Sequence, residues 1–141
     1  MRSSDPALLK RLSILIVGGH SLILGVAMLF APIRFLTLAG WPYPPVQDPF
    51  FASQSGIFLL ILGVAYLAAL RHDVLVWLIV GSKLAAVLFL FGHGIFAGAP
   101  FQVMLLGAAD ACLGLLVVAG VAAEQSARSR CSAQERAATE E

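Results

Sequence analysis

The stretch VLVWLIVGSKLAAVLFLFGHGIF, residues 74–96, decides the fold. It is an almost unbroken apolar run, and a helix needs about 20 such residues to cross the hydrocarbon core of a bilayer. Its single charged residue, Lys83, stands close to its middle. Because an unpaired charge at the bilayer centre costs at least about 2.5–3.5 kcal/mol, this lysine needs a partner or a wet surrounding. The stretch therefore predicts a membrane-spanning helix with a buried charge.

Three further apolar runs have the length of a membrane span. They cover residues 12–31, 50–70 and 101–123, and the last of them carries Asp110 at a depth comparable to that of the lysine. Only the polar residues 71–73 separate the second span from the third, which predicts an antiparallel helical hairpin. The fold class that follows is all-α, an integral membrane four-helix bundle occupying residues 12–123.

The composition supports lipid as the solvent of this chain. Of its 141 residues 60% are hydrophobic and 12% are charged, whereas about a quarter are charged in a soluble domain. A net charge of +1 without a basic patch argues against nucleic acid as a partner. Cys112 and Cys131 form no CxxC motif, so we expect no metal site. No metalloprotease, nucleophile-elbow or phosphate-loop motif is present, so we expect no catalytic residue.

The N-terminal apolar run is longer than the core of a signal peptide, which takes about 7–15 residues. We therefore expect a retained membrane anchor, preceded by a polar lead over residues 1–11 in which Asp5 caps the helix. Densely placed prolines exclude a continuous helix through residues 32–49. In that connection Trp41 and Tyr43 suit the level of the lipid headgroups.

Tyr66 and Trp77 suit the headgroup level on the opposite side of the membrane. Residues 124–141 are charged and alanine-rich without an apolar face, and we expect a polar, frayed or disordered tail there.

The distribution of basic residues predicts the orientation in the membrane. Four spans place both termini on one side. Of the nine Lys and Arg residues, Arg34 lies on the other side and Lys83 lies inside, which leaves seven on the side of the termini. The positive-inside rule makes that side cytoplasmic and residues 32–49 an exterior loop. The expected location is the bacterial inner membrane.

The two buried charges lie at matching depths. Lys83 is nine residues in from the cytoplasmic side, and Asp110 is nine residues in from the other side. At 1.5 Å per residue they differ by roughly 6 Å in height, which a lysine side chain can bridge. Three interpretations stay open: an ion pair that fixes helix packing, a ligand or proton site, and contact with a partner subunit.

Three more polar residues are candidates for the same buried site: His20, His93 and Gln54. His20 lies near the middle of the first span and is a potential third member, although a neutral histidine with one hydrogen bond is the simpler interpretation. His93 lies roughly 10 Å from the level of His20, which argues against one haem held between them. We predict no cofactor, and contact with haem or pigment only through a partner.

Glycines mark the expected packing faces of the second and fourth spans. Gly56 and Gly63 lie seven residues apart, and Gly107 and Gly114 share a face with Asp110. Small residues at such spacing allow another helix to approach closely in a membrane.

Three segments carry a resemblance to a known family. They are SGIFLLILGVAYLAAL in the second span, GSKLAAVLFL in the third and GAADACLGLL in the fourth. This layout resembles the DoxX-like group of small four-helix bacterial membrane proteins over residues 12–123, although Gln54 or Ser55 stands where an arginine is often expected. Some members are described as accessory subunits of membrane oxidoreductase systems. The resemblance implies such a role and assigns no catalytic residue.

Two functions follow from these observations. The favoured one is a non-catalytic accessory subunit of a larger bacterial membrane complex for respiratory or photosynthetic electron transfer. The alternative is a small oligomeric transporter, channel or lipid- or small-molecule-binding protein that uses Lys83, Asp110 and His20. The expected partners are the lipid bilayer and other membrane subunits or further copies of the chain. An enzyme is the least favoured interpretation.

Overall fold

The computed structural model describes residues 6–40 and 50–139, without the side chains of residues 135, 137 and 139. The predicted cap at Asp5 and the headgroup positions of Trp41 and Tyr43 lie outside the described residues. The described chain forms five helices: α1 (Pro6–Phe30), α2 (Pro32–Leu38), α3 (Phe50–Ala68), α4 (Val74–Phe96) and α5 (Phe101–Thr139).

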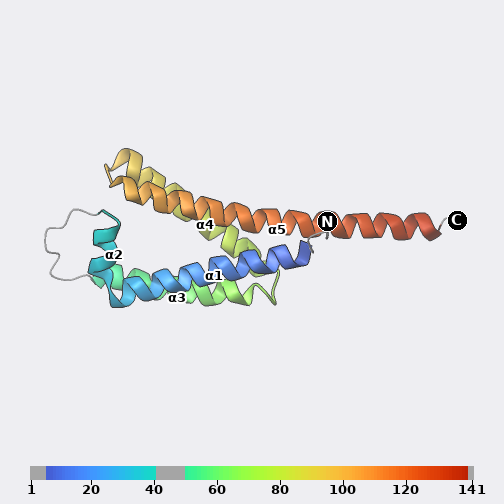
Figure 1. The fold of residues 1–141 in the computed structure, drawn as a ribbon, viewed down its shortest axis with the longest axis horizontal. Helices are drawn as coiled ribbons and strands as arrows, with labels where there is room; N and C mark the ends of the chain where they lie inside the picture. Colours follow the sequence, from blue (N-terminus) through green and yellow to red (C-terminus); the bar gives the residue numbers. More distant parts are fainter. Residues whose placement is uncertain (1–5, 41–49, 140–141) are drawn as a thin grey trace.

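The four long helices pack as two pairs, α1 with α3 and α4 with α5 (Figure 1). The two pairs meet mainly through α1 and α5. Helices α3 and α4 are joined by the turn of residues 69–73 and run in opposite directions, but they touch little. The predicted hairpin is therefore present as a connection and contributes little of the packing.

The bundle has two distinct ends, which we call the turn end and the loop end. The turn end holds the start of α1 and the turn of residues 69–73, and the loop end holds α2. Figure 1 shows the two helix pairs close together at the turn end and farther apart toward the loop end. At the loop end Gly40, which follows α2 with a φ of 73°, lies against the side chain of Gln102 at the start of α5.

The buried core lies mainly toward the turn end, where the two helix pairs are close together. Its residues are Ile14, Val17, Tyr66, Ala69, Val76, Ile79 and Val117. In α4 the buried residues are Val76, Ile79 and Lys83, all in the half of the helix nearer the turn end. Lys83 therefore marks the level at which the core shared by the two helix pairs ends.

Glycines set the distance between α1 and α3. A Cβ atom at Gly56 would lie 2.6 Å from the backbone nitrogen of Leu29 and 2.8 Å from the carbonyl oxygen of Gly25. A Cβ at Gly63 would lie 2.7 Å from a methyl group of Leu22. The predicted close approach at Gly56 and Gly63 is confirmed. The matching pair on α1, Gly18 and Gly25, has the same seven-residue spacing.

Glycines also line the contact between α4 and α5. Gly107 faces the side chains of Leu90 and Phe91, and Gly114 faces the Cβ of Lys83. The predicted packing face on the fourth span is therefore confirmed, and its partner is the third span.

The prediction of a frayed or disordered tail is wrong for the described residues, because α5 continues to Thr139. The tail extends a helix that already exists, so it needs no new nucleus. Alanine, arginine, glutamine and glutamate are also good helix formers. An ion pair of 2.5 Å between Arg128 and Glu124, one helical turn apart, supports the start of this extension.

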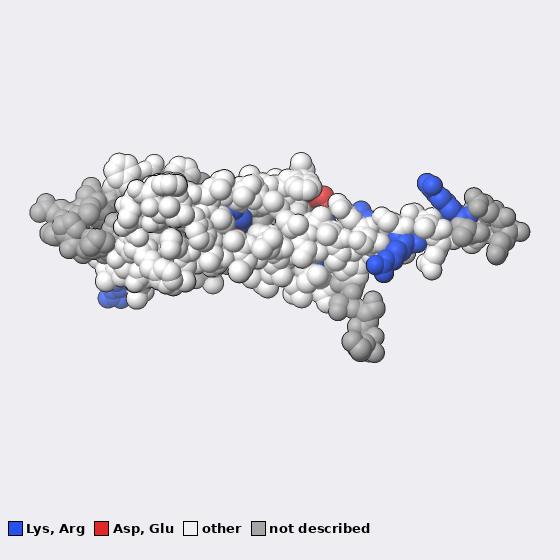
Figure 2. Space-filling model, turned by 90° about the horizontal axis from the view of Figure 1, so that it is seen from above, with Lys and Arg blue, Asp and Glu red and all other residues white. Residues whose placement is uncertain are grey.

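Helices α1, α3, α4 and α5 are long and apolar enough to cross a membrane. On the face shown in Figure 2, most of the body carries no charged surface, and the blue and red surface gathers mainly toward the tail of α5. These features indicate a multi-pass membrane protein. Apolar side chains such as Ile23, Phe51 and Leu88, all more than 65% exposed, would then face lipid.

Replacing Gly56 by alanine tests the contact between α1 and α3. Gly56→Ala is expected to destabilise the protein by roughly 1–3 kcal/mol, because the added Cβ forces two backbones apart. Gly19→Ala is the matched control, since a Cβ there would meet no atom within 4 Å apart from the neighbouring backbone of its own helix. Melting temperatures of the two variants in mild detergent provide the measurement. Equal values would contradict the close approach.

Candidate functional site

The structure joins the two buried charges that the sequence placed at similar depth. Lys83 Nζ on α4 lies 2.5 Å from Asp110 Oδ1 on α5, and their side chains are 8% and 15% exposed. A Cβ added at Gly114 would lie 3.3 Å from the Cβ of Lys83, so the backbone of α5 comes close to the root of the lysine side chain. The ion pair therefore sits within the contact between α4 and α5.

A second polar contact connects α3 with α4 near the same level. The hydroxyl of Tyr66 lies 2.5 Å from Ser82 Oγ. Ser82 donates its own hydrogen to the carbonyl of Leu78 at 2.7 Å, so the tyrosine is the donor to the serine. Tyr66 is only 2% exposed. The ring therefore packs inside the bundle and does not face the lipid headgroups, whereas the sequence had suggested the headgroup level.

His20 brings α1 to the same polar region. It lies close enough to interact electrostatically with both Lys83 and Asp110. Its Nδ1 atom and the hydroxyl of the adjacent Ser21 are buried and have no hydrogen-bond partner within the described chain. We call His20, Tyr66, Ser82, Lys83 and Asp110 the central cluster; it draws on all four long helices.

The other two candidates lie apart from these contacts. His93 is exposed, its Nδ1 lies 3.0 Å from the carbonyl oxygen of Phe89 on its own helix, and its ring stacks at a tilt on that of Phe89. Gln54 is exposed on α3. Over residues 6–40 and 50–139 no three His, Cys, Asp or Glu side chains gather as a metal site.

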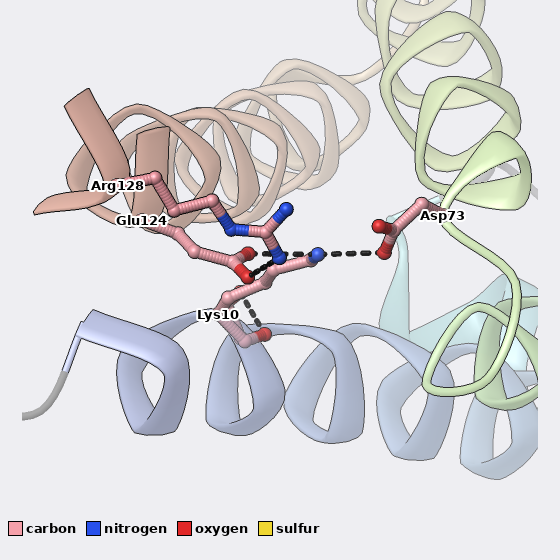
Figure 3. A network of polar contacts seen from close by, with 5 residues as sticks. Lys10, Asp73, Glu124 and Arg128 are labelled. Atoms are coloured by element: carbon pink, nitrogen blue, oxygen red, sulfur yellow. Dashed lines mark hydrogen bonds and ion pairs between the residues drawn. The ribbon is translucent and has the colours of Figure 1, made fainter. Parts of the chain in front are cut away.

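A second charged group lies at the turn end (Figure 3). Lys10 Nζ on α1 lies 2.7 Å from Asp73 Oδ1, in the turn before α4, and 2.8 Å from Glu124 Oε2 on α5. Arg128 binds the other oxygen of Glu124. We call Lys10, Asp73, Glu124 and Arg128 the terminal network. It ties three separate segments of the chain together.

Sequence reasoning missed this network. The available signal was that its members lie where the first, third and fourth spans reach the same side of the membrane. Gly120 permits the contact, because a Cβ there would lie 2.9 Å from the Cα of Lys10. The hydrogen bond from the Lys10 ammonium holds the pKa of the Asp73 carboxyl below its usual range.

Comparison with known protein families, curated proteins and solved structures gives no match to this chain. The DoxX-like resemblance therefore stays an expectation from the sequence.

Neutralising the buried charges tests whether they act as a pair. Lys83→Met and Asp110→Asn should each cost about 3–5 kcal/mol, because each leaves one buried charge without its partner. The double variant should recover much of that loss. Free energies of unfolding for the wild type and the three variants, measured in detergent, give the coupling energy. Strictly additive losses would exclude the pairing.

The pH dependence of stability tests the contact between Lys10 and Asp73. A carboxyl whose pKa is lowered by folding adds stability above its unfolded pKa and loses that contribution as the pH falls through its folded pKa. The Asp73 side chain is 73% exposed, so the contribution is expected to be below about 1 kcal/mol. Melting temperature is measured from pH 7 downward for the wild type and Asp73→Asn. The two curves should converge below about pH 4. Parallel curves would contradict the contact.

Proposed function

We propose that this chain is a non-catalytic accessory subunit of a larger bacterial membrane complex. It would lie in the inner membrane with both termini in the cytoplasm. The observation that carries the proposal is the extension of α5, residues 125–139, which we call the arm. Figure 1 shows the arm projecting beyond all the other helices. At 1.5 Å per residue it reaches about 22 Å past Glu124.

The arm has the features of a surface for another protein. Nearly all of its described side chains are exposed, from Gln125 to Ala138. A helix that is polar all round gains little from burial within its own chain, and such helices commonly bridge to a neighbouring domain. A rigid arm at the turn end would give a partner a fixed point of attachment outside the lipid.

The central cluster supports a structural role within the membrane. Lys83 with Asp110 and Tyr66 with Ser82 satisfy one another across helix boundaries. Contacts of this kind hold helices together in lipid, where apolar side chains gain nothing by leaving the hydrocarbon. They supply packing without requiring a substrate.

The proposed orientation rests on the basic residues. Lys10 and Arg128 belong to the terminal network at the turn end, and Arg71 lies in the adjacent turn. Arg34 lies on α2 at the loop end. An excess of Lys and Arg on the cytoplasmic side of short connections is the general rule for membrane proteins.

The kind of host complex follows from the DoxX-like resemblance. Some members of that group are described as accessory to membrane oxidoreductases, so a respiratory or photosynthetic electron-transfer complex is the proposed host. Any haem or pigment would belong to the partner and reach this chain only by contact.

Breaking the arm tests the proposal. The tagged full-length protein, purified from its native membrane in gentle detergent, should carry larger membrane proteins in a fixed ratio. Ala133→Pro should remove them, because proline interrupts the helix and its hydrogen bonds. Ala133→Ser is the control at the same exposed position and should retain them. Quantitative mass spectrometry gives the ratios. Isolation of the chain alone from all three preparations would overturn the proposal.

A second candidate function is favoured by one observation. The buried Nδ1 of His20 and hydroxyl of Ser21 have unused hydrogen-bonding capacity beside the ion pair. A small transporter, channel or binding protein would use such groups for a proton or a polar ligand. This alternative predicts transport by the purified chain in liposomes, with loss of transport in Asp110→Asn. An inactive wild type would exclude it.

A further inference from the structure

Two hollows adjoin the terminal network at the turn end. One, of about 230 Å³, is lined by residues of α4 and α5, and the other, of about 200 Å³, lies beside the start of α1 and the turn before α4. Both are lined by Lys10, Asp73, Glu124 and Arg128. The network therefore forms a shared polar wall between an apolar hollow and a more polar one.

The larger hollow is a valine-lined groove between α4 and α5. Val76 and Val80 line it from α4, and Val118 and Val121 line it from α5. From Asp73 to Val80 the groove extends seven residues, or about 10 Å, toward the membrane interior. Trp77 forms part of its lining and is 66% exposed, so this part of the groove lies at the surface. An apolar groove at the end of a membrane span suits the upper part of a lipid acyl chain.

Two arginine side chains beside the groove have N–H donors that no ion pair within the described residues uses. The Arg128 side chain is 71% exposed and binds Glu124 through one of its nitrogens. Arg11 lines the smaller hollow, is exposed, and has no ion pair within the described residues. Guanidinium groups match the geometry of phosphate and bind it through two parallel hydrogen bonds. Arg11 and Arg128 are therefore placed to receive a phosphate.

An anionic group in the same place has an open acceptor. Asp73 binds Lys10 through Oδ1 and is 73% exposed, which leaves its other oxygen accessible. Asp73 lines both hollows. A carboxylate near a bound phosphate would repel a purely anionic headgroup and would attract an ammonium group.

We propose that this end of the bundle binds a phospholipid whose headgroup carries both a phosphate and a primary ammonium, a phosphatidylethanolamine. The phosphate lies between Arg11 and Arg128, the ammonium faces Asp73, and one acyl chain enters the valine-lined groove. Arg128 lies in the first turn of the arm, and Arg11, Asp73 and the valines lie outside it. Lipid binding is measured on the isolated protein, so its outcome does not depend on the proposed subunit role.

Lipid binding to the full-length protein tests this site. Native mass spectrometry of the protein with added phosphatidylethanolamine, phosphatidylcholine or phosphatidylglycerol measures the occupancy of each. Phosphatidylethanolamine should bind tightest. Arg11→Gln should weaken that binding about tenfold, the equivalent of about 1.4 kcal/mol. Arg130→Gln, an exposed arginine that lines neither hollow, is the matched control and should bind as the wild type does.

Asp73→Asn separates the two parts of the headgroup. It should remove the preference for phosphatidylethanolamine over phosphatidylcholine while leaving binding of the phosphate intact. Val118→Trp should fill the groove and lower binding of every lipid, with a melting temperature that shows the protein is folded. The proposal would be overturned if the wild type bound the three lipids equally and Arg11→Gln bound them as well as the wild type does. So would displacement of the lipid by millimolar inorganic phosphate, which would identify the site as one for a soluble anion.

Discussion

Hydrocarbon surroundings impose the constraint on which this structure depends: apolar side chains gain nothing by leaving lipid for one another. Helices must then associate through close backbone approach or through polar contacts. The chain uses the first between α1 and α3, where Gly25 and Gly56 meet, and adds the second between α4 and α5, where Lys83 meets Asp110. Both helix pairs thus use glycines for close approach, and the pair of α4 and α5 adds an ion pair.

The polar contacts also explain at which level along the bundle the two helix pairs are packed together. The core shared by the two pairs lies in the half toward the turn end, between the terminal network and the central cluster. Each of these groups contains opposite charges in direct contact, so neither leaves a large net charge near the lipid. Beyond Lys83 α4 has no buried residue, and there the pairs separate.

Much of the fold was predictable because hydropathy and depth are readable along the chain. The four spans and the matching heights of Lys83 and Asp110 follow from counting residues. The lateral order of helices does not, since residue counts give height and say nothing of neighbours. For that reason the contact of Tyr66 with Ser82 and the contacts of Lys10 were missed. The tail was misjudged because its composition was considered without the helix that it extends.

The continuity of α5 has a mechanical consequence. One helix of 39 residues carries Asp110 in the membrane, Glu124 in the terminal network and the exposed arm outside. At 1.5 Å per residue this rod is about 58 Å long. Because Lys10 holds Glu124, that point acts as a fulcrum. A sideways force on the arm would therefore turn α5 about Glu124 and act on the buried ion pair between Lys83 and Asp110. The helix thus couples the arm mechanically to the central cluster.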